Sequence, residues 1–206
     1  IAYSNEGSAP RMIALASGTS VTLSPGSAIL VSAKNDGQIE LAKGEAYFDV
    51  RHDPSRVLTV SAGNYRVTDI GTRFSVNLAN SALRVGVAQG AVSVAGAQTA
   101  SAVRVDAGHQ LVGKDGLLTL STVEPSQVGS WRSGRLTYTN APLAMVAGDI
   151  ERYSGKRISV DSALENKHFS GILVIGDGSK LASDLAAVMG LEVRQQGDLV
   201  HIAAGR

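Results

Sequence analysis

The stretch Val67–Val76, VTDIGTRFSV, carries the pattern that decides the fold. Apolar and polar residues alternate towards both of its ends, which is typical of β-strands with one buried face. Gly71 and Thr72 interrupt the alternation. Because glycine weakens a strand interior, it marks a bend, a bulge or a close backbone approach. The stretch therefore predicts two strand runs that meet at Gly71–Thr72, and it raises the question whether that peptide bond has chemistry of its own.

The same alternation extends outward over residues 1–122. Short strand-like runs recur there: TSVTL, SAILV, QIEL, AYFDV, VLTV, YRVTD, TRFSV, ALRVGVA, AVSV, AVRVD, HQLV and LLTL. Turn sequences such as SPG, NDG, AGN and KDG separate the runs. Runs at this spacing without a helical stretch predict a mainly β domain of many short strands, a sandwich or a twisted ribbon stack.

The pattern changes after residue 122. Residues 123–134 contain Pro125, Gly129 and several polar residues, which predicts a linker, with the single tryptophan, Trp131, as an anchor beside it. From Leu136 onward two helical repeats follow, each placed between strand runs. The apolar faces of the two predicted helices are formed by Leu143, Val146, Ala147 and Ile150 and by Leu181, Leu185 and Val188.

The ends of these two helices carry recognisable signals. Asn140 and Ser179 are the predicted N-caps, and Gly155 and Gly190 are the predicted C-terminal stops. Residues 135–206 are therefore predicted to form a small α+β domain of two β-α-β units, with two helices on a short sheet. The predicted organisation is a β domain over 1–122, a linker over 123–134 and this domain over 135–206.

Composition excludes several classes of function. The formal net charge is +1, from 19 basic and 18 acidic residues, and no nucleic-acid motif is present, so nucleic acid is not an expected partner. The chain has no cysteine and hence neither disulfides nor thiolate metal sites. No apolar run approaches the roughly 18 residues that span a bilayer. We expect a soluble piece of a longer protein, with any anchor or export signal upstream of Ile1.

Four motifs carry a resemblance to a known family. LAKGEAYFDV, VTDIGTRFSV, LRVGVAQGAVSV and VRVDAGHQLV, in this order and spacing, resemble the periplasmic region of FecR-type anti-sigma factors. WRSGRLTYTNAPLAMVAGDIERYSGKRISV resembles the segment that follows in the same proteins. The last 70 residues or so are similar to the short signalling fold that secretins and TonB-dependent transducers also contain.

The resemblance implies a role in cell-surface signalling. Such regulators hold an extracytoplasmic-function sigma factor with a cytoplasmic domain, cross the inner membrane once, and place a region like this one in the periplasm. That region contacts the signalling domain of an outer-membrane TonB-dependent transducer, commonly a siderophore transporter, and periplasmic proteases then act in the release of the sigma factor. This chain lacks the cytoplasmic domain, so a sigma factor is implied as a partner only through that missing part.

The partner surface is expected on the small C-terminal domain, because a sheet of few strands leaves an edge open for strand addition. Residues 158–174 are the predicted region, with ISV and FSGILV as its strands. The candidate partner-binding residues are Ile158, Val160, Phe169, Ile172 and Val174.

Neither a cofactor nor a metal is expected. No two of the four histidines, His52, His109, His168 and His201, have metal-ligand spacing, so direct binding of iron is not predicted. GDGSK, residues 176–180, is interpreted as a turn into the second helix rather than a phosphate loop. Glu45 is interpreted as a turn ligand for backbone N–H groups with Arg73 as its possible ion-pair partner, and Arg152 as a charge that complements a helix dipole.

Gly71–Thr72 is the candidate for chemistry. A threonine hydroxyl can attack the carbonyl carbon of the preceding residue and convert the peptide bond into an ester, which water then hydrolyses. The resemblance implies this site, because several FecR-type regulators cleave themselves at the matching Gly-Thr. The alternative is a tight bend or bulge without chemistry. Single-turnover self-cleavage is thus the first rival to the signalling role, and a passive adhesion or glycan-binding domain, disfavoured by scarce aromatic residues, is the second.

Overall fold

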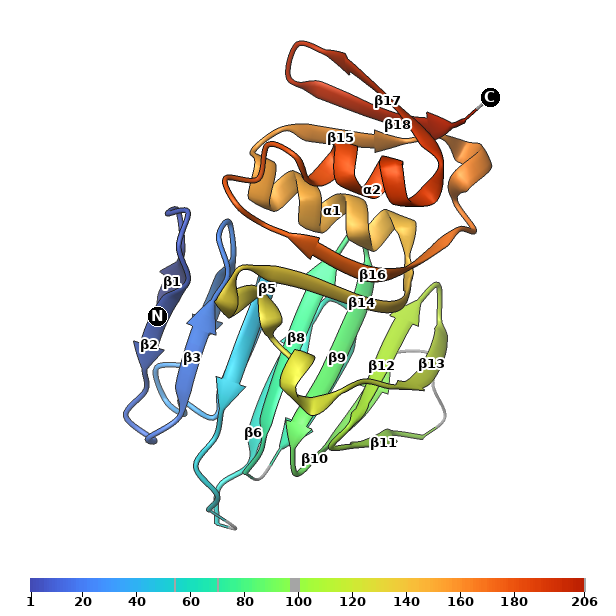
Figure 1. Ribbon diagram of the computed structural model, residues 1–206. Coiled ribbons are helices and arrows are strands. Elements are labelled where there is room, and N and C mark those ends of the chain that lie inside the picture. The colour runs from blue at the N-terminus through green and yellow to red at the C-terminus, as the bar shows by residue number, and fades with distance from the viewer. Residues whose placement is uncertain (54, 70, 97–100, 206) are drawn as a thin grey trace. The chain divides into compact units, whose positions relative to one another are not determined.

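The computed structural model describes residues 1–53, 55–69, 71–96 and 101–205, so Ile70 of the VTDIGTRFSV stretch lies outside the described residues (Figure 1). The chain divides into two compact units, Ile1–Gly129 and Ser130–Arg206, here called the N-terminal and C-terminal units. Strands make up 53% of the structure and helices 16%, which confirms the mainly β prediction.

The N-terminal unit consists of two sheet layers that share one long strand, β5 (Gln38–Asp49). The first layer contains β1 (Ala2–Ser4), β4 (Ala28–Val31), the first half of β5, β6 (Leu58–Ala62), β7 (Tyr65–Asp69), β10 (Ala91–Gly96) and β11 (Val103–Asp106). The second layer contains β2 (Arg11–Ala14), β3 (Ser20–Leu23), the second half of β5, β8 (Arg73–Ala79), β9 (Ala82–Gln89), β12 (His109–Lys114) and β13 (Leu117–Thr122).

β5 passes from one layer to the other at its middle. Lys43 pairs with Ala28 of the first layer, and the next residue, Gly44, pairs with Leu78 of the second. A Cβ at Gly44 would lie 2.2 Å from the Ser27 Oγ, so only glycine fits at this passage. The sequence predicts two separate runs here, whereas the structure joins them into one strand that ties the layers together.

After β5 the chain alternates between the layers, one hairpin at a time. The hairpins β6–β7 and β10–β11 belong to the first layer, and β8–β9 and β12–β13 belong to the second (Figure 1). Each change of layer needs a short crossover, and Gly71–Thr72 forms the one from β7 to β8. The motif in question therefore lies at a corner of the sandwich rather than within a strand.

The core of the N-terminal unit lies between the two layers. It is built mainly from valine, leucine and isoleucine, and its buried residues include two aromatic ones, Phe48 and Phe74. These two rings stack at a centroid distance of 4.9 Å across the β5–β8 pair. Fully burying one large apolar side chain contributes about 1.5–3 kcal/mol, so this pair anchors β8 to β5.

The segment after β13 contains two short 3-10 helices, η1 (Pro125–Gln127) and η2 (Ser130–Ser133). Val128 is buried and packs on Gly86 of β9, where a Cβ would lie 3.4 Å from a Val128 methyl carbon. Trp131 is buried as well. The predicted domain limits at 122 and 135 stay predictions.

The C-terminal unit consists of two helices between two small sheets (Figure 1). Its elements are β14 (Arg135–Pro142), α1 (Leu143–Ser154), β15 (Arg157–Val160), η3 (Ser162–Leu164), β16 (His168–Val174), α2 (Leu181–Met189), β17 (Leu191–Gln196) and β18 (Leu199–Ala204). β14 pairs with β16, and β18 lies between β15 and β17.

This arrangement differs from the predicted single short sheet. Each helix joins a strand of one sheet to a strand of the other, so the helices are covered on two sides. α1 accordingly buries six of its twelve residues, including Met145 and Asp149, which lie outside the predicted apolar face. One-stripe periodicity cannot reveal a second covered side, which is why the sequence predicted one sheet.

The glycine stops are confirmed, whereas the predicted N-caps are wrong. Gly155 and Gly190 end α1 and α2 in the left-handed conformation. Asn140 lies within β14, at an irregularity of the ladder, and its backbone N–H donates to the Ser170 Oγ. Ser179 precedes α2 by two residues, and its hydroxyl donates to Asp177. In both places a non-local or turn hydrogen bond replaces the expected cap.

Among the described residues, no helix combines the length and the apolar character needed to cross a membrane.

Candidate functional site

The β7–β8 crossover is held by the carboxylate of Asp69, the last residue of β7. Its Oδ1 accepts a hydrogen bond of 2.6 Å from the Thr72 hydroxyl, and its Oδ2 accepts one of 3.0 Å from the Gly71 N–H. Asp69 and Thr72 are 2% and 4% exposed. The hydroxyl of the candidate nucleophile is therefore bound to a buried carboxylate at the short end of hydrogen-bond lengths.

Gly71 has a backbone conformation that other residues avoid, with φ at +140°. A Cβ at this position would lie 2.5 Å from the His52 Cα and 2.6 Å from the His52 Cβ, so the segment after β5 occupies the space of a side chain. On its other side the crossover meets Gly90, where a Cβ would lie 2.5 Å from the Thr72 methyl carbon. The crossover is thus packed between two neighbouring segments, and both its torsion and its surroundings require glycine at position 71.

The two carbonyl groups of the crossover are held differently. The Thr72 carbonyl oxygen accepts a hydrogen bond of 2.9 Å from the Val50 N–H. No hydrogen bond to the Gly71 carbonyl oxygen is found within the described part of the chain. An acyl shift needs a nucleophile, an acceptor for its proton and a donor for the developing oxyanion. The first two are in place at this crossover.

Sequence reasoning identified Gly71 and Thr72 but missed Asp69. The signal that points to it is the spacing Asp-x-Gly-Thr, in which an aspartate side chain reaches the N–H two residues on and the hydroxyl three residues on. An aspartate at a strand end is an ordinary turn residue, and its burial follows only from the stacking of neighbouring crossovers.

The interpretation of Glu45 as a ligand for backbone N–H groups is corrected by the structure. Glu45 is 2% exposed, and its carboxylate accepts hydrogen bonds from the side chains of Ser75 at 2.7 Å and Asn77 at 3.1 Å. Arg84 lies 3.7 Å from the same carboxylate. β5, β8 and β9 are neighbours in the second layer, which brings these residues together from up to 39 positions away.

Two arginine interpretations also change. Arg73 binds the Asp49 carboxylate at 3.1 Å instead of Glu45, and this hydrogen bond raises the pKa of the guanidinium further above its usual value. Arg152 pairs with Asp149, whose side chain is fully buried in α1 and also accepts a hydrogen bond of 3.0 Å from the Tyr138 hydroxyl. Arg152 is therefore a partner of a buried charge rather than only a complement to the helix dipole.

The five predicted partner-binding residues lie on β15 and β16, and three of them are on β16. Ile172 and Val174 are 53% and 65% exposed. Phe169 is buried and packs its ring 5.6 Å from that of Tyr138, so its side chain belongs to the interior. Ile158 and Val160 on β15 are half-buried. The structure thus divides the predicted set into an exposed pair, a half-buried pair and one buried residue.

The backbone of β16 presents a free edge at the exposed pair. Ile175 N–H donates to Gly134 C=O at 2.9 Å in the antiparallel register that pairs Ile172 with Thr137. Because hydrogen-bonded and non-bonded positions alternate in an antiparallel ladder, the N–H and C=O groups of Ile172 and Val174 point away from β14. Among the described strands, β16 pairs only with β14, so this edge has no strand partner.

The edge of β15 is less open. The Arg157 N–H donates to the carbonyl of Asp198, just before β18, and the Asp161 N–H donates to Ile202 of β18. The N–H groups of Ile158 and Val160 between them therefore point outward. The Ile158 N–H is already bound, at 3.1 Å, by the Glu151 carboxylate of α1. A charged side chain that binds an edge N–H competes with an added strand.

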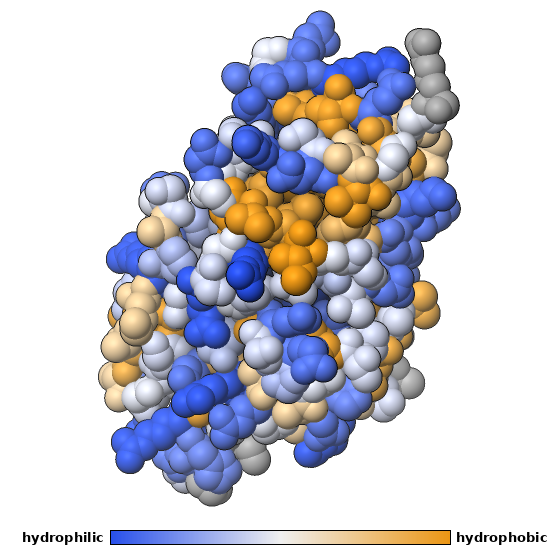
Figure 2. All heavy atoms as spheres, in the orientation of Figure 1, coloured by the Kyte–Doolittle hydropathy of each residue, from blue (hydrophilic) through white to orange (hydrophobic). Residues whose placement is uncertain are grey.

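Hydrophobic residues gather on the surface over β16 in Figure 2. The exposed large hydrophobic residues of the C-terminal unit include Ile172 and Val174 on β16, Val188 on α2 and Val193 on β17. Singly exposed apolar residues need no explanation, but two neighbours on one face of an unpaired edge strand are typical of an interaction site.

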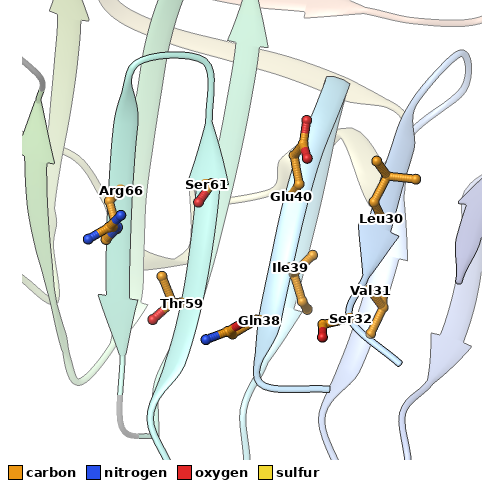
Figure 3. Close-up of a pocket in the computed structure, with 9 residues that line it drawn as sticks. All are labelled: Leu30, Val31, Ser32, Gln38, Ile39, Glu40, Thr59, Ser61 and Arg66. Atoms are coloured by element: carbon orange, nitrogen blue, oxygen red, sulfur yellow. The ribbon is translucent and has the colours of Figure 1, made fainter. Parts of the chain in front are cut away.

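The N-terminal unit has a polar groove of about 530 Å³ on the outer face of its first layer (Figure 3). Its lining residues come from β4 to β7 and the turn after β4: Leu30, Val31, Ser32, Gln38, Ile39, Glu40, Thr59, Ser61 and Arg66. The register places Ser61 between Glu40 and Arg66, so the floor is formed by a small residue between two long charged ones. The lining includes no aromatic ring on which a sugar would stack.

The four histidines are divided between the two units, with His52 and His109 in the N-terminal unit and His168 and His201 in the C-terminal unit. His52 and His168 are exposed, and His109 and His201 are half-buried. The His201 Nδ1 lies 2.9 Å from the Ser159 hydroxyl on the adjacent strand. No group of three or more potential metal ligands occurs among the residues that the structure describes.

The match to a protein family covers the part of the chain that holds the crossover. Residues 4–93 match the family model described as FecR protein, and they include VTDIGTRFSV. Residues 4–93 are therefore similar to the FecR family. This confirms the resemblance seen in the four motifs, three of which fall wholly or mostly within the matched residues.

Solved structures are similar over the whole chain. Two crystal structures of a candidate anti-sigma factor from Parabacteroides distasonis, at 1.65 Å and 2.50 Å resolution, match with a TM-score of 0.85 and 20% sequence identity. The match covers 100% of this chain and 100% or 99% of theirs. At 20% sequence identity, this similarity shows that the fold is shared, and nothing further. Among curated proteins, no relative matches the chain.

Proposed function

We propose that this chain is the signal-receiving periplasmic region of a FecR-type anti-sigma factor that is anchored in the inner membrane by one span. It binds the signalling domain of an outer-membrane TonB-dependent transducer and thereby controls release of an extracytoplasmic-function sigma factor. The observation that carries this proposal is the FecR match at residues 4–93 together with the full-length fold likeness to a candidate anti-sigma factor. The role requires binding and no catalysis.

The proposed contact is the free edge of β16, with Ile172 and Val174 as its central residues. Their outward N–H and C=O groups offer hydrogen bonds to an added strand, and their exposed side chains offer apolar contact. Ile158 and Val160 on β15 form a second edge, one N–H of which is occupied by Glu151. Phe169 supports β16 from inside the unit.

The proposed partner has a fold similar to that of the C-terminal unit, so two edge strands can pair. Main-chain hydrogen bonds supply affinity in such pairing, and side-chain pockets supply specificity. Siderophore uptake and iron are proposed only for the genes that the pathway controls. The proposed transducer senses the siderophore, and iron itself is not a proposed ligand of this chain.

The test compares two substitutions at Ile172. Ile172→Pro removes an outward N–H without removing a bond to β14, whereas Ile172→Thr keeps the N–H and the β-branched shape. Binding of the transducer signalling domains of the source bacterium to the whole chain is measured by calorimetry. We expect Kd to rise about tenfold or more for Ile172→Pro, equivalent to about 1.4 kcal/mol, and clearly less for Ile172→Thr.

Val160→Pro on β15 is the matched control, since it removes an outward N–H from the other edge. If Val160→Pro weakens binding more than Ile172→Pro does, the contact lies on β15. If no transducer domain binds the unaltered chain, the signalling role itself is wrong.

The second candidate function is self-cleavage between Gly71 and Thr72, and the Asp69–Thr72 hydrogen bond is the observation that favours it. The cut would separate residues 1–71 from 72–206. The two pieces would stay together, because β5 of the first pairs with β8 of the second over six residue pairs and β7 pairs with β10. The Phe48–Phe74 contact crosses the same boundary.

Intact mass spectrometry of the purified chain over time tests this candidate. Scission predicts two fragments, one ending at Gly71 and one beginning at Thr72, and hydroxylamine speeds their appearance by trapping the ester. Thr72→Val abolishes the fragments and Thr72→Ser retains some. A chain that stays whole under all these conditions leaves the crossover as a structural bend.

A further inference from the structure

The carboxylate of Asp69 is the buried titratable group in contact with the Gly71–Thr72 segment. Its Oδ2 accepts a hydrogen bond from the Gly71 N–H, and its Oδ1 accepts one from the Thr72 hydroxyl. The two hydrogen bonds therefore lie on either side of the Gly71–Thr72 peptide bond. A buried carboxylate is costly unless hydrogen bonds compensate for its lost hydration. The two hydrogen bonds supply this compensation, and they hold Oδ1 against the Thr72 hydroxyl.

A second crossover of the same unit shows that the fold does not need a buried carboxylate there. Asp106 ends β11 as Asp69 ends β7, and each is followed two residues later by a glycine that leads into the second layer. Asp106 is exposed and binds Arg104 at 2.8 Å instead of reaching into the corner. The Asp-x-Gly crossover thus forms with its carboxylate outside, and the buried position of Asp69 is particular to the corner that contains Thr72.

We infer that Asp69 is the base of the scission, a catalytic residue that accepts the proton of the Thr72 hydroxyl; the inference rests on the self-cleavage proposed above. Thr72 Oγ1 forms a bond to the Gly71 carbonyl carbon while its proton passes to Asp69 Oδ1. The tetrahedral adduct breaks the Gly71 C–Thr72 N bond, and the proton on Asp69 passes to the leaving nitrogen. The product is an ester between Gly71 and the Thr72 oxygen, with a free amine on Thr72.

Hydrolysis completes the balance. Water adds to the ester carbon, leaving Gly71 with a carboxylate and restoring the Thr72 hydroxyl, and no oxidant, reductant or cofactor is consumed. The second carboxylate oxygen keeps its hydrogen bond to the Gly71 N–H and so holds Oδ1 towards the hydroxyl during the first step. A positioned base of this kind contributes about 10²–10⁴-fold to a rate.

The experiment measures the rate of fragment formation by intact mass on the full chain and its variants. Asp69→Asn keeps the size of the side chain and removes the base, so we expect at least about a 100-fold loss of rate. Asp106→Asn, the same change at the matching crossover, should alter the rate less than about twofold. Circular dichroism and thermal unfolding confirm that each variant is folded.

Asp69→Glu separates a base from a merely structural acceptor. A base role predicts that Glu, which retains a carboxylate, cleaves faster than Asn, whereas a packing role predicts the reverse because Asn fits the buried space. Asn cleaving at the wild-type rate, or faster than Glu, would overturn the assignment of Asp69 while leaving scission intact. If the unaltered chain yields no fragments, scission itself fails and the role of Asp69 fails with it.

Discussion

The chain contains the dipeptide Gly-Thr twice, at Gly18–Thr19 and at Gly71–Thr72, in two different settings. Both glycines have positive φ, +84° and +140°, and both threonines are almost fully buried. Gly18 lies in the turn between β2 and β3, which is closed by hydrogen bonds between Leu15 and Gly18 and between Leu15 and Thr19. Gly71 lies at a change of sheet layer.

The difference between the two settings lies in what surrounds the glycine and what binds the hydroxyl. A Cβ at Gly18 would meet only the flexible Arg51 side chain, at 3.7 Å, whereas one at Gly71 would meet the His52 backbone at 2.5 Å. The Thr72 hydroxyl donates to a buried carboxylate, and no carboxylate within the described ranges accepts the Thr19 hydroxyl. The dipeptide is therefore uninformative, and the crossover and Asp69 are what distinguish the second copy.

The largest expected effect comes from replacing the two glycines by alanine. Gly71→Ala has to displace the His52 backbone and adopt an unfavourable φ, so we expect a loss of about 2–4 kcal/mol in the free energy of unfolding. Gly18→Ala should cost about 1–2 kcal/mol, from the left-handed conformation alone. Urea unfolding followed by circular dichroism measures both losses, and equal losses would mean that the crossover is no tighter than the hairpin turn.

The next effect comes from removing the two hydroxyl groups. Thr72→Val removes the hydrogen bond of 2.6 Å that the Thr72 hydroxyl donates to the buried Asp69 carboxylate, which should cost about 1–3 kcal/mol of stability. Thr19→Val keeps shape and removes no bond to a charged group, so a change within about 0.5 kcal/mol is expected. A double variant, Thr72→Val with Asp69→Asn, should recover part of the loss, because a buried neutral amide loses less than a buried carboxylate when one donor is removed. Failure to recover would indicate that the loss arises from packing.

Strand alternation and turn sequences were sufficient to predict the mainly β character, because several strands of the N-terminal unit, such as β3 and β6, alternate between buried and partly exposed residues. Glycine stops were also readable: Gly155 and Gly190 end helices in a conformation that disfavours other residues. The alternation of successive hairpins between the two layers could not be predicted, because a period-two pattern does not indicate which sheet a strand joins. QIEL and AYFDV accordingly counted as two runs, although β5 is continuous.

The missed features depend on contacts between distant segments. Glu45 meets Arg84 only because β8 pairs with both β5 and β9. Asp69 is buried because neighbouring crossovers pack on the corner. Asn140 lies in a strand rather than at a helix N-cap, and its N–H is bound by the Ser170 hydroxyl. A local pattern ranks these residues by their turn or cap propensity, and tertiary hydrogen bonds override that ranking.

The smallest expected effect concerns the residue after the second dipeptide, Arg73, which has the neutral Ser20 as its counterpart. Arg73 is exposed and pairs with Asp49 at 3.1 Å, and this hydrogen bond raises the pKa of the guanidinium above its usual value. An exposed pair of this kind is screened by salt and contributes little to stability. We therefore expect Arg73→Gln to shift the midpoint of thermal unfolding by less than about 2 °C, and the shift should shrink further at high salt.

The Arg73→Gln substitution should also leave any scission at Gly71–Thr72 unchanged, because the proton acceptor is Asp69 and not the Asp49 carboxylate that Arg73 binds. A large or salt-insensitive shift would mean that the Asp49–Arg73 pair holds the crossover in shape, and the contrast with Gly18–Thr19 would then rest on this ion pair as well as on the buried carboxylate.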